Sequence, residues 1–419
     1  MSTAAVGFSA AQGWRYGLLG LPLAFAALPL YVLLPNHYAR EYGVPLAALG
    51  TLLLAVRLLD AVLDPWLGRL CDRLFARSTT AVLSFGRWAA LLLAAGFVLL
   101  FFPPVRGTVA LVAWAAVALT LTSLAFSALS IAHQSWGAML GGDEAQRSRV
   151  VAWREGWGLA GVLLASVLPL VAGLAAAAAT LAAALAAGWL AWTQAPRPVP
   201  QRDAAPTDWK LPWRQPAFRR LLAVFMLNGV ASAVPATLVL FFLQDRLRAP
   251  AAMQPLFLGA YFLCAALAIP VWLRVVARIG LARTWLAGML LAIAAFAGAG
   301  LLQEGDAGWF LLVCVFSGAA LGTDLAIPGA LLAGAIAAAG ERGRSEGVWF
   351  GWWNFASKLN LALAAGLALP LLALAGYAPG SRDDAALSAL AFAYGLLPCA
   401  LKLAAAGLLY LTLIRRNSP

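Results

Sequence analysis

Long apolar segments recur along the whole chain, and they restrict the folds that it can adopt. Of its 419 residues, 63% are hydrophobic and 11% are charged, against about 25% charged in an ordinary soluble domain. A helix that crosses a bilayer needs about 20 apolar residues, because a rise of about 1.5 Å per residue must cover about 30 Å of hydrocarbon. The sequence therefore predicts an all-α membrane protein with about twelve transmembrane helices.

Charged residues, Pro and Gly separate the apolar segments and set the bounds of the expected spans. These spans are 14–35, 44–70, 82–103, 107–140, 150–173, 174–193, 217–245, 254–277, 281–303, 307–338, 346–376 and 386–414. A Pro-rich, charged segment lies at the middle of the chain. We therefore expect an N-terminal six-helix bundle at 1–193, a central cytoplasmic loop at 194–216 and a C-terminal six-helix bundle at 217–419.

Basic residues are distributed unevenly between alternate loops. If the N-terminus is cytoplasmic, most Lys and Arg residues fall in cytoplasmic loops and the C-terminal tail. The loops on the other side then carry Arg40, Arg106, Arg246, Arg248 and Arg382. By the positive-inside rule, both termini are expected in the cytoplasm, with the chain in a bacterial inner membrane.

Several functional classes lack their usual residues. The net charge of +12 does not indicate nucleic-acid binding, because the arginines interrupt apolar segments instead of alternating with aromatic residues. The four cysteines are scattered, so neither a disulfide framework nor a metal site is expected. No Walker motif, H-E-x-x-H or G-x-S-x-G occurs. We expect no enzyme activity, no catalytic residue and no cofactor; the expected partners are a small-molecule substrate, a coupling cation and the lipid bilayer, and the expected state is a monomer.

Charged side chains inside apolar spans are the first candidates for function, because each costs at least ~2.5–3.5 kcal/mol at mid-bilayer. In helix 2, Arg57, Asp60 and Asp64 follow at spacings of three and four, which puts them on one helix face. Two carboxylates ~6 Å apart repel by ~3 kcal/mol at an effective dielectric of ~20. One of them should stay protonated unless Na⁺, Li⁺ or H⁺ joins the pair, which is the chemistry of a cation-coupling site. The structural alternative is that Arg57 neutralises one aspartate and the other caps a helix break at Pro65.

The segment from Tyr16 to Gly68 resembles the glycoside-pentoside-hexuronide:cation symporter family of the major facilitator superfamily. Its run VRLLDAVLDPWLG fits the pattern R-x-x-D-x-x-x-D-P-x-x-G, and GDEAQRSRVVAWREG resembles the basic loop between helices 4 and 5. Lys358, in FASKLNLALAAG, falls where the family places its helix 11 lysine. The resemblance implies a major facilitator fold of two six-helix bundles, Asp60 and Asp64 as cation ligands, and Lys358 as their electrostatic partner. Sugars and glycosides are the family's commonest substrates.

Three positions depart from the family's pattern. Ala24 and Ser130 stand where melibiose permease-like members carry acids that hold galactosyl hydroxyls, and Leu63 replaces a neutral cation ligand. Na⁺ requires several oxygen ligands, whereas H⁺ requires one carboxylate. We therefore favour H⁺ coupling over Na⁺. A lysophospholipid or fatty-acid-like amphiphile is the alternative to a sugar, and a polytopic membrane enzyme or a channel is a less favoured interpretation.

Polar residues on other spans complete the expected site. His133 and Gln134 on helix 4 are expected to line a central cavity and bind substrate, although a His satisfied by backbone groups is an equal alternative. Trp136 either stacks on a sugar or packs in the bundle, and packing is favoured. Arg154 and Glu155, beside the basic loop, are expected to form a cytoplasmic gate.

The second half of the chain contributes further candidates. Asp324 is expected to face the central cavity and pair with Lys358, whose helix face Asn354 shares. Asn228 is expected either to bind substrate or to join helices. Lys402 is expected to extend toward the membrane surface and is discounted.

Overall fold

The chain folds into helices alone over the residues that the computed structural model describes, which are 8–201, 208–250, 253–378 and 380–415. In lipid, backbone N–H and C=O groups have no water to bond, and a helix satisfies them within one segment. This requirement explains why apolar segments so far apart in sequence adopt the same secondary structure. Residues 202–207 of the predicted central loop lie outside the described part.

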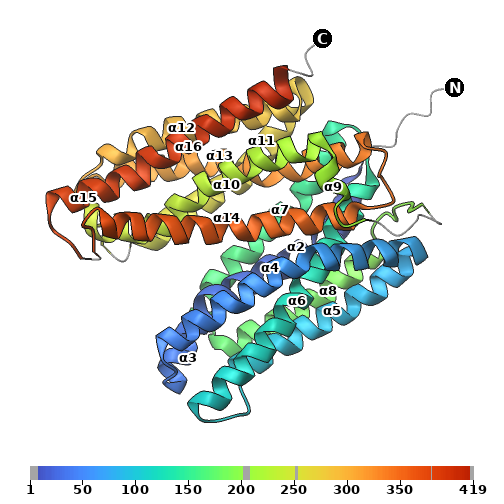
Figure 1. The fold of residues 1–419 in the computed structure, drawn as a ribbon, viewed down its shortest axis with the longest axis horizontal. Helices are drawn as coiled ribbons and strands as arrows, with labels where there is room; N and C mark the ends of the chain where they lie inside the picture. The colour runs from blue at the N-terminus through green and yellow to red at the C-terminus, as the bar shows by residue number, and fades with distance from the viewer. Residues whose placement is uncertain (1–7, 202–207, 251–252, 379, 416–419) are drawn as a thin grey trace. The chain divides into compact units, whose positions relative to one another are not determined.

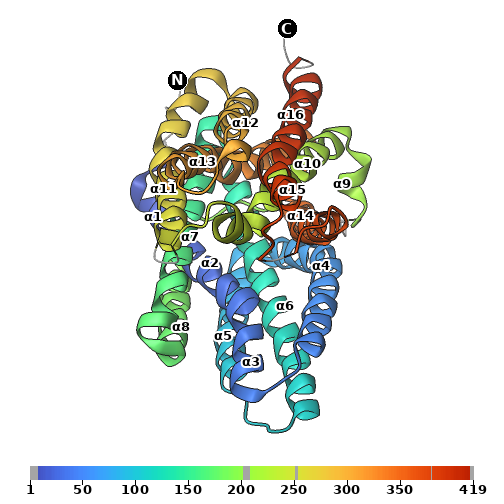
Figure 2. The same cartoon turned by 90° about the vertical axis from the view of Figure 1, so that its left-hand side faces the viewer.

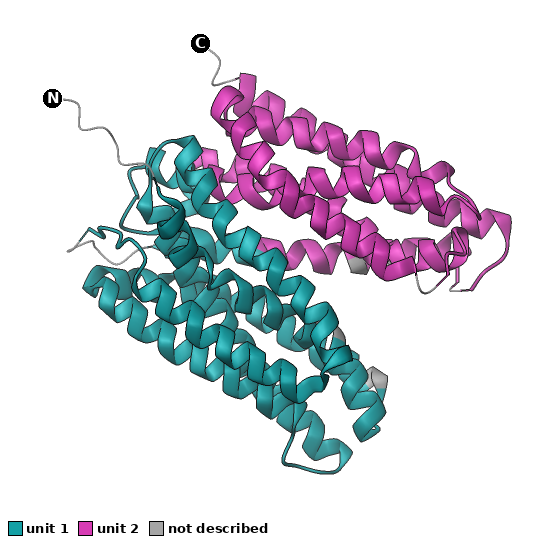
Figure 3. Ribbon diagram, turned by 180° about the vertical axis from the view of Figure 1, so that it is seen from behind, with its two compact units in different colours: residues 1–214, 333–355 teal, residues 215–332, 356–419 magenta. Residues whose placement is uncertain are grey.

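The described helices divide between two compact units (Figure 3). The first contains residues 1–214 and 333–355, and the second contains residues 215–332 and 356–419. The bundle boundaries expected at 193 and 217 stay a prediction. The first unit holds α1 (Ala10–Gly17), α2 (Gly20–Leu28), η1 (Pro29–Leu33), α3 (Leu34–Tyr42), α4 (Leu46–Arg77), α5 (Thr79–Phe101), α6 (Thr108–Leu140), α7 (Glu144–Val171), α8 (Gly173–Thr193) and α9 (Leu211–Arg214).

The second unit begins with α10. It holds α10 (Pro216–Phe241), η2 (Phe242–Arg246), α11 (Gln254–Ile279), α12 (Leu281–Ala297), η4 (Ala299–Leu301), α15 (Asp384–Ala391), η5 (Phe392–Leu396), α16 (Leu397–Leu409) and η6 (Tyr410–Ile414). Two long helices are shared, because the end of α13 (Ala307–Ala338) and the start of α14 (Glu346–Leu374) belong to the first unit.

Nine described helical segments are long and apolar enough to cross a membrane. The run from α1 to α3, together with α4 and α14, accounts for the remaining three predicted spans. Helix α4 extends to Arg77, seven residues beyond the expected end of its apolar span at residue 70. Its last turns are amphipathic: Cys71 and Phe75 are buried one turn apart, whereas Arg73 and Arg77 are exposed. A hydropathy criterion misses such a turn, although its buried face continues the helix.

Neighbouring helices in each unit lie close together. In the first unit α2 packs on α7, α5 on α6 and α8, and α4 on α6 (Figures 1 and 2). In the second unit α16 lies against α10 and α12. In the same unit, the rings of Phe242 in η2 and Tyr394 in η5 stack with centroids 4.2 Å apart. These contacts bury an apolar core within each unit.

The short helix α9 is held by aromatic stacking. The Trp209 ring lies between Trp66 of α4 and Trp352 of α14, with centroids 5.8 Å and 5.7 Å away. The Trp352 indole N–H also donates to the Trp209 carbonyl at 2.7 Å. Stacked rings contribute about 0.5–1.5 kcal/mol each beyond the burial of area. The end of the central loop is thereby fixed against two membrane helices.

Glycines allow the closest helix contacts, and α7 offers a matched pair to test this. A Cβ at Gly161 would collide with the Leu21 carbonyl of α2, whereas a Cβ at Gly156 would meet nothing within 4 Å. Overpacking costs about 1–3 kcal/mol. We predict that Gly161→Ala lowers the Tm of the protein in lipid nanodiscs by a few degrees, and that Gly156→Ala leaves it unchanged or raises it. Equal Tm changes in the two variants would contradict this packing.

Candidate functional site

Two buried carboxylates lie one turn apart on α4. Asp60 is 3% exposed and Asp64 is 0% exposed, although α4 carries exposed apolar residues on its other face. The Ser127 hydroxyl of α6 donates a hydrogen bond to Asp60 at 2.9 Å. Arg57, one turn before Asp60, is exposed. The sequence predicted that both acids share one face of the span 44–70, which is α4 here. The burial of both carboxylates agrees with that prediction.

The start of α14 packs against the backbone of α4 at Asp64, and glycine makes this approach possible. A Cβ at Gly351 would lie 2.5 Å from the Asp64 carbonyl oxygen. Gly68 and Gly347 are equally close, since a Cβ on either would collide with the other's carbonyl oxygen. Small residues allow helix backbones to come together in this way. The absence of side chains at these positions thus lets α14 cover Asp64.

A third carboxylate of α4, Asp72, caps the start of α14. It accepts hydrogen bonds from the backbone N–H groups of Gly347 at 2.6 Å and Val348 at 3.0 Å. The first N–H groups of a helix lack partners within the helix, and a carboxylate there also interacts favourably with the positive end of the helix dipole. Asp72 was not among the functional residues predicted from the sequence. The signal was present, because Asp60, Asp64, Gly68 and Asp72 recur every four residues.

Gln134 and Asn354 are brought together. The Gln134 amide donates to the Ser130 hydroxyl at 2.8 Å and to the Asn354 side-chain oxygen at 3.3 Å. Both residues are partly buried. They supply neutral hydrogen-bonding groups, which are what a hydroxyl-rich substrate requires.

His133 and Trp136 have the contacts of packed residues. The His133 Nε2 lies 2.8 Å from the Tyr16 carbonyl oxygen, and its ring is 4.4 Å from the Tyr16 ring. The Trp136 indole donates to the Pro196 carbonyl at 2.9 Å and packs on Trp192. These contacts correspond to the packing alternatives considered for both residues.

Arg154 and Glu155 form an ion pair on α7. The Arg154 Nε lies 3.0 Å from the Glu155 carboxylate, and both side chains are mostly buried. A gating role for the pair stays a prediction.

In the second unit, Asp324 of α13 pairs with Lys402 of α16, at 3.0 Å, and not with Lys358 as expected. Asn228 of α10 donates to Asp324 at 3.0 Å and accepts from Lys402 at 2.7 Å. The Lys402 side chain is 6% exposed, so the expectation that it extends to the membrane surface is wrong. The nearby carboxylate and amide each accept a hydrogen bond from the ammonium inside the bundle, which no pattern on α16 alone reveals. Lys358 of α14 is partly buried.

Metal-binding clusters were not expected, and among the described residues no group of three His, Cys, Asp or Glu side chains could hold a metal ion. Cys71, Cys264, Cys314 and Cys399 are free thiols.

Known transport proteins resemble this chain in sequence and in fold. The family described as MFS/sugar transport protein matches residues 15–416. The chain is 30% identical to Escherichia coli inner membrane symporter YicJ over 164 residues and 30% identical to the E. coli putative glycoside/cation symporter YagG over 159 residues. Each match spans 38% of this chain and 34% of the relative's length. The fold resembles a crystal structure of a bacterial homologue of the iron transporter ferroportin in its outward-facing state, with a TM-score of 0.69 at 16% identity over 94% of this chain and 99% of that one.

The capping contact of Asp72 has a direct test. We predict that Asp72→Ala increases hydrogen exchange at the Gly347 and Val348 amides by about 5- to 30-fold, because losing a cap costs about 1–2 kcal/mol. Asp143→Ala is the matched control, since Asp143 caps its own helix at Gln146. The control should affect exchange near Gln146 and leave the start of α14 unchanged. Unchanged exchange at Gly347 and Val348 in Asp72→Ala would contradict the contact.

Proposed function

This chain belongs to the MFS/sugar transport protein family, whose fold and members are those of transporters and not of enzymes, and from this premise we propose that it is a cation-coupled secondary transporter. It moves a small organic solute together with a cation by alternating access. The observation that carries the proposal is the buried pair Asp60 and Asp64, one turn apart on α4. The activity remains a proposal because the curated relatives match over about a third of their length.

The coupling step follows from the cost of buried charge. Two ionised carboxylates on adjacent turns repel each other, and burial removes the water that would screen them. A bound cation or proton relieves this repulsion. Because α14 packs over Asp64 and is capped by Asp72 of the same helix, a change of charge on α4 acts directly on a helix contact. Cation occupancy is thereby linked to helix packing, as symport requires.

We favour H⁺ as the coupling cation. Na⁺ binding requires several oxygen ligands, and the residue beside Asp64 is Leu63, which offers none. The Ser127 hydroxyl, which donates a hydrogen bond to Asp60, is one neutral oxygen beside the acids. A proton needs only a carboxylate.

The remaining candidates have supporting roles in this proposal. Arg57 tunes the charge near the acids, and Gln134 and Asn354 hydrogen-bond the substrate. Lys358 contributes a positive charge in the second unit. Arg154 and Glu155 act as a cytoplasmic gate that exchanges ion-pair partners. Asn228 and Asp324 act in the second unit.

A sugar or glycoside is the favoured substrate. The paired amides of Gln134 and Asn354 suit hydroxyl groups, and two relatives are named as symporters, one of them as a glycoside/cation symporter. The alternative is a lysophospholipid or a fatty-acid-like amphiphile, since Ala24 and Ser130 replace the acids that hold the substrate in galactoside-binding members that this sequence resembles. An inner-membrane location with both termini cytoplasmic accords with the basic loops and with the name of one relative.

The coupling proposal predicts a specific loss in Asp60→Asn and Asp64→Asn. In vesicles that contain the purified protein, a substrate-driven pH transient should appear with one member of a panel of glycosides and lysophospholipids. Both variants should lose this transient and uphill accumulation while keeping downhill flux. Asp208→Asn is the control, because Asp208 lies in an exposed ion pair. A transient of wild-type size in both variants would refute the coupling site.

The choice between cations predicts the behaviour of Leu63→Asn. Adding a side-chain oxygen beside Asp64 should create Na⁺-stimulated transport that wild-type protein lacks. Leu63→Met, which keeps the residue apolar, is the matched control. Na⁺ stimulation already present in the wild type would overturn the preference for H⁺.

A further inference from the structure

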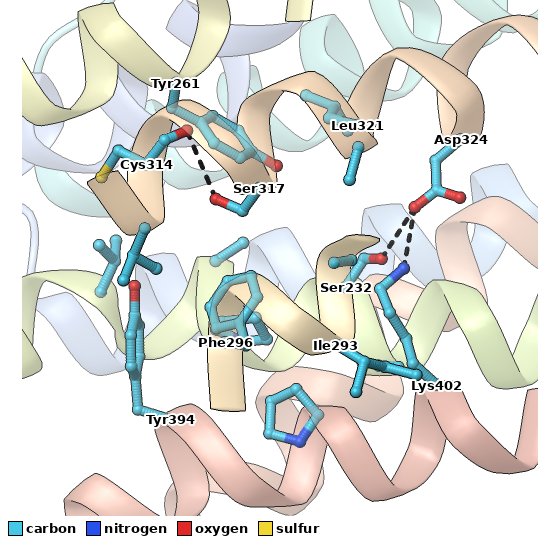
Figure 4. Close-up of a pocket in the computed structure, with 18 of the residues that line it drawn as sticks. Ser232, Tyr261, Ile293, Phe296, Cys314, Ser317, Leu321, Asp324, Tyr394 and Lys402 are labelled. Carbon is cyan, nitrogen blue, oxygen red and sulfur yellow. Dashed lines mark hydrogen bonds and ion pairs between the residues drawn. The ribbon is translucent and has the colours of Figure 1, made fainter. Parts of the chain in front are cut away.

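A cavity of about 220 Å³ lies inside the second unit, whereas Asp60 and Asp64 belong to the first unit (Figure 4). Its walls come from α10, α11, α12, α13 and the segment from η5 to α16. Most of the lining is apolar, including Pro235, Phe257, Ile293, Phe296 and Leu321. The cavity is smaller than the roughly 300–1,000 Å³ of drug-sized sites, so it suits a single ring or a short chain.

One end of the cavity is charged, because the ion pair of Asp324 and Lys402 lines it (Figure 4). Asp324 is hydrogen-bonded by three neutral donors besides Lys402. These are the Asn228 amide at 3.0 Å, the Ser232 hydroxyl at 3.3 Å and the Trp285 indole at 2.8 Å. The carboxyl group is therefore held in place by groups other than its cationic partner.

Lys402 is less completely satisfied. An ammonium group has three N–H donors, and among the described residues Lys402 uses two, on Asn228 and Asp324. Its side chain is 94% buried and lines an otherwise apolar space. A ligand with an oxygen acceptor can take the remaining donor, and hydrogen bonds to charged acceptors are the stronger ones.

We propose that this cavity binds a small organic weak acid, with its carboxylate on Lys402, its apolar body against Phe296 and Leu321, and its proton on Asp324. The acid's O–H bond breaks, and an O–H bond forms on the Asp324 carboxyl, so one anion and one proton enter together. The site then holds one cation and one anion, as it does when empty. An anion that entered alone would leave a buried net negative charge, which is costly.

The titratable groups that surround Asp324 are few. Lys402 and Cys399 approach from α16 and Tyr261 from α11, while α10 and α12 contribute the neutral groups Asn228, Ser232 and Trp285. Figure 4 shows Tyr261 and Ser317 side by side, removed from the ion pair. Asp324 is thus the carboxyl group available to accept the proton beside Lys402.

Equilibrium binding of radiolabelled 4-phenylbutyrate to the full chain in nanodiscs tests this proposal, with empty nanodiscs as the blank. Its neutral isostere 4-phenylbutanamide is the comparison ligand. Lys402→Met should weaken 4-phenylbutyrate binding by about 10- to 100-fold, which is the worth of a hydrogen bond to a charged group. Binding of the amide should stay within about threefold. Arg248→Gln is the matched control, because it removes a cation from an exposed ion pair of the same unit.

Two further measurements keep the proposal testable if Lys402→Met does not fold. Leu321→Trp fills the cavity while keeping Asp324 and Lys402, and it should abolish binding of both ligands. In the wild type, 4-phenylbutyrate affinity should rise about tenfold for each unit by which the pH falls, since one proton accompanies each anion. Full binding in Leu321→Trp, a pH-independent affinity, or equal loss of acid and amide in Lys402→Met would each overturn the proposal. Binding is measured without transport, so the result is independent of the coupling role of Asp60 and Asp64.

Discussion

Asp60 and Asp64 are carboxylates placed where water cannot reach them, on adjacent turns of one helix. A carboxylate in that position must gain a counter-charge, a set of hydrogen bonds or a proton. Asp60 gains a hydrogen bond from Ser127, and α14 packs over Asp64 through glycine contacts. The proposed coupling mechanism depends on how the charge of this pair affects the packing of α4 against the start of α14.

Four buried or partly buried carboxyl groups gain stabilising contacts in three different ways in this chain. Asp72 uses backbone N–H groups at the start of α14. Asp324 uses a lysine and three neutral donors. Asp60 and Asp64 lie on adjacent turns of the same helix face, where two ionised carboxylates would repel each other. This difference explains why we assign cation coupling to α4 and weak-acid binding to the cavity of the second unit.

The sequence predicted the features that depend on residues near one another in the chain. Hydropathy identified the spans, and the spacing of Asp60 and Asp64 identified a shared helix face. The sequence did not reveal the features that depend on tertiary contacts. The extension of α4 beyond residue 70 follows from the burial of Cys71 and Phe75, and Lys402 is buried because Asn228 and Asp324 lie beside it. Neither partner of Lys402 is near it in sequence, so a single helix pattern could not identify the pair.

The most direct test of the account is the protonation state of the α4 carboxyl groups. Infrared difference spectroscopy on the protein in lipid, recorded as the pH is raised, reports protonated carboxyl groups by their carbonyl stretch. The account predicts a protonated carboxyl signal that is lost on deprotonation in the wild type and is smaller in the Asp60→Asn, Asp64→Asn double variant, by the share that these two groups contribute. The same signal undiminished in the double variant would show that the proton lies elsewhere and would contradict coupling at α4.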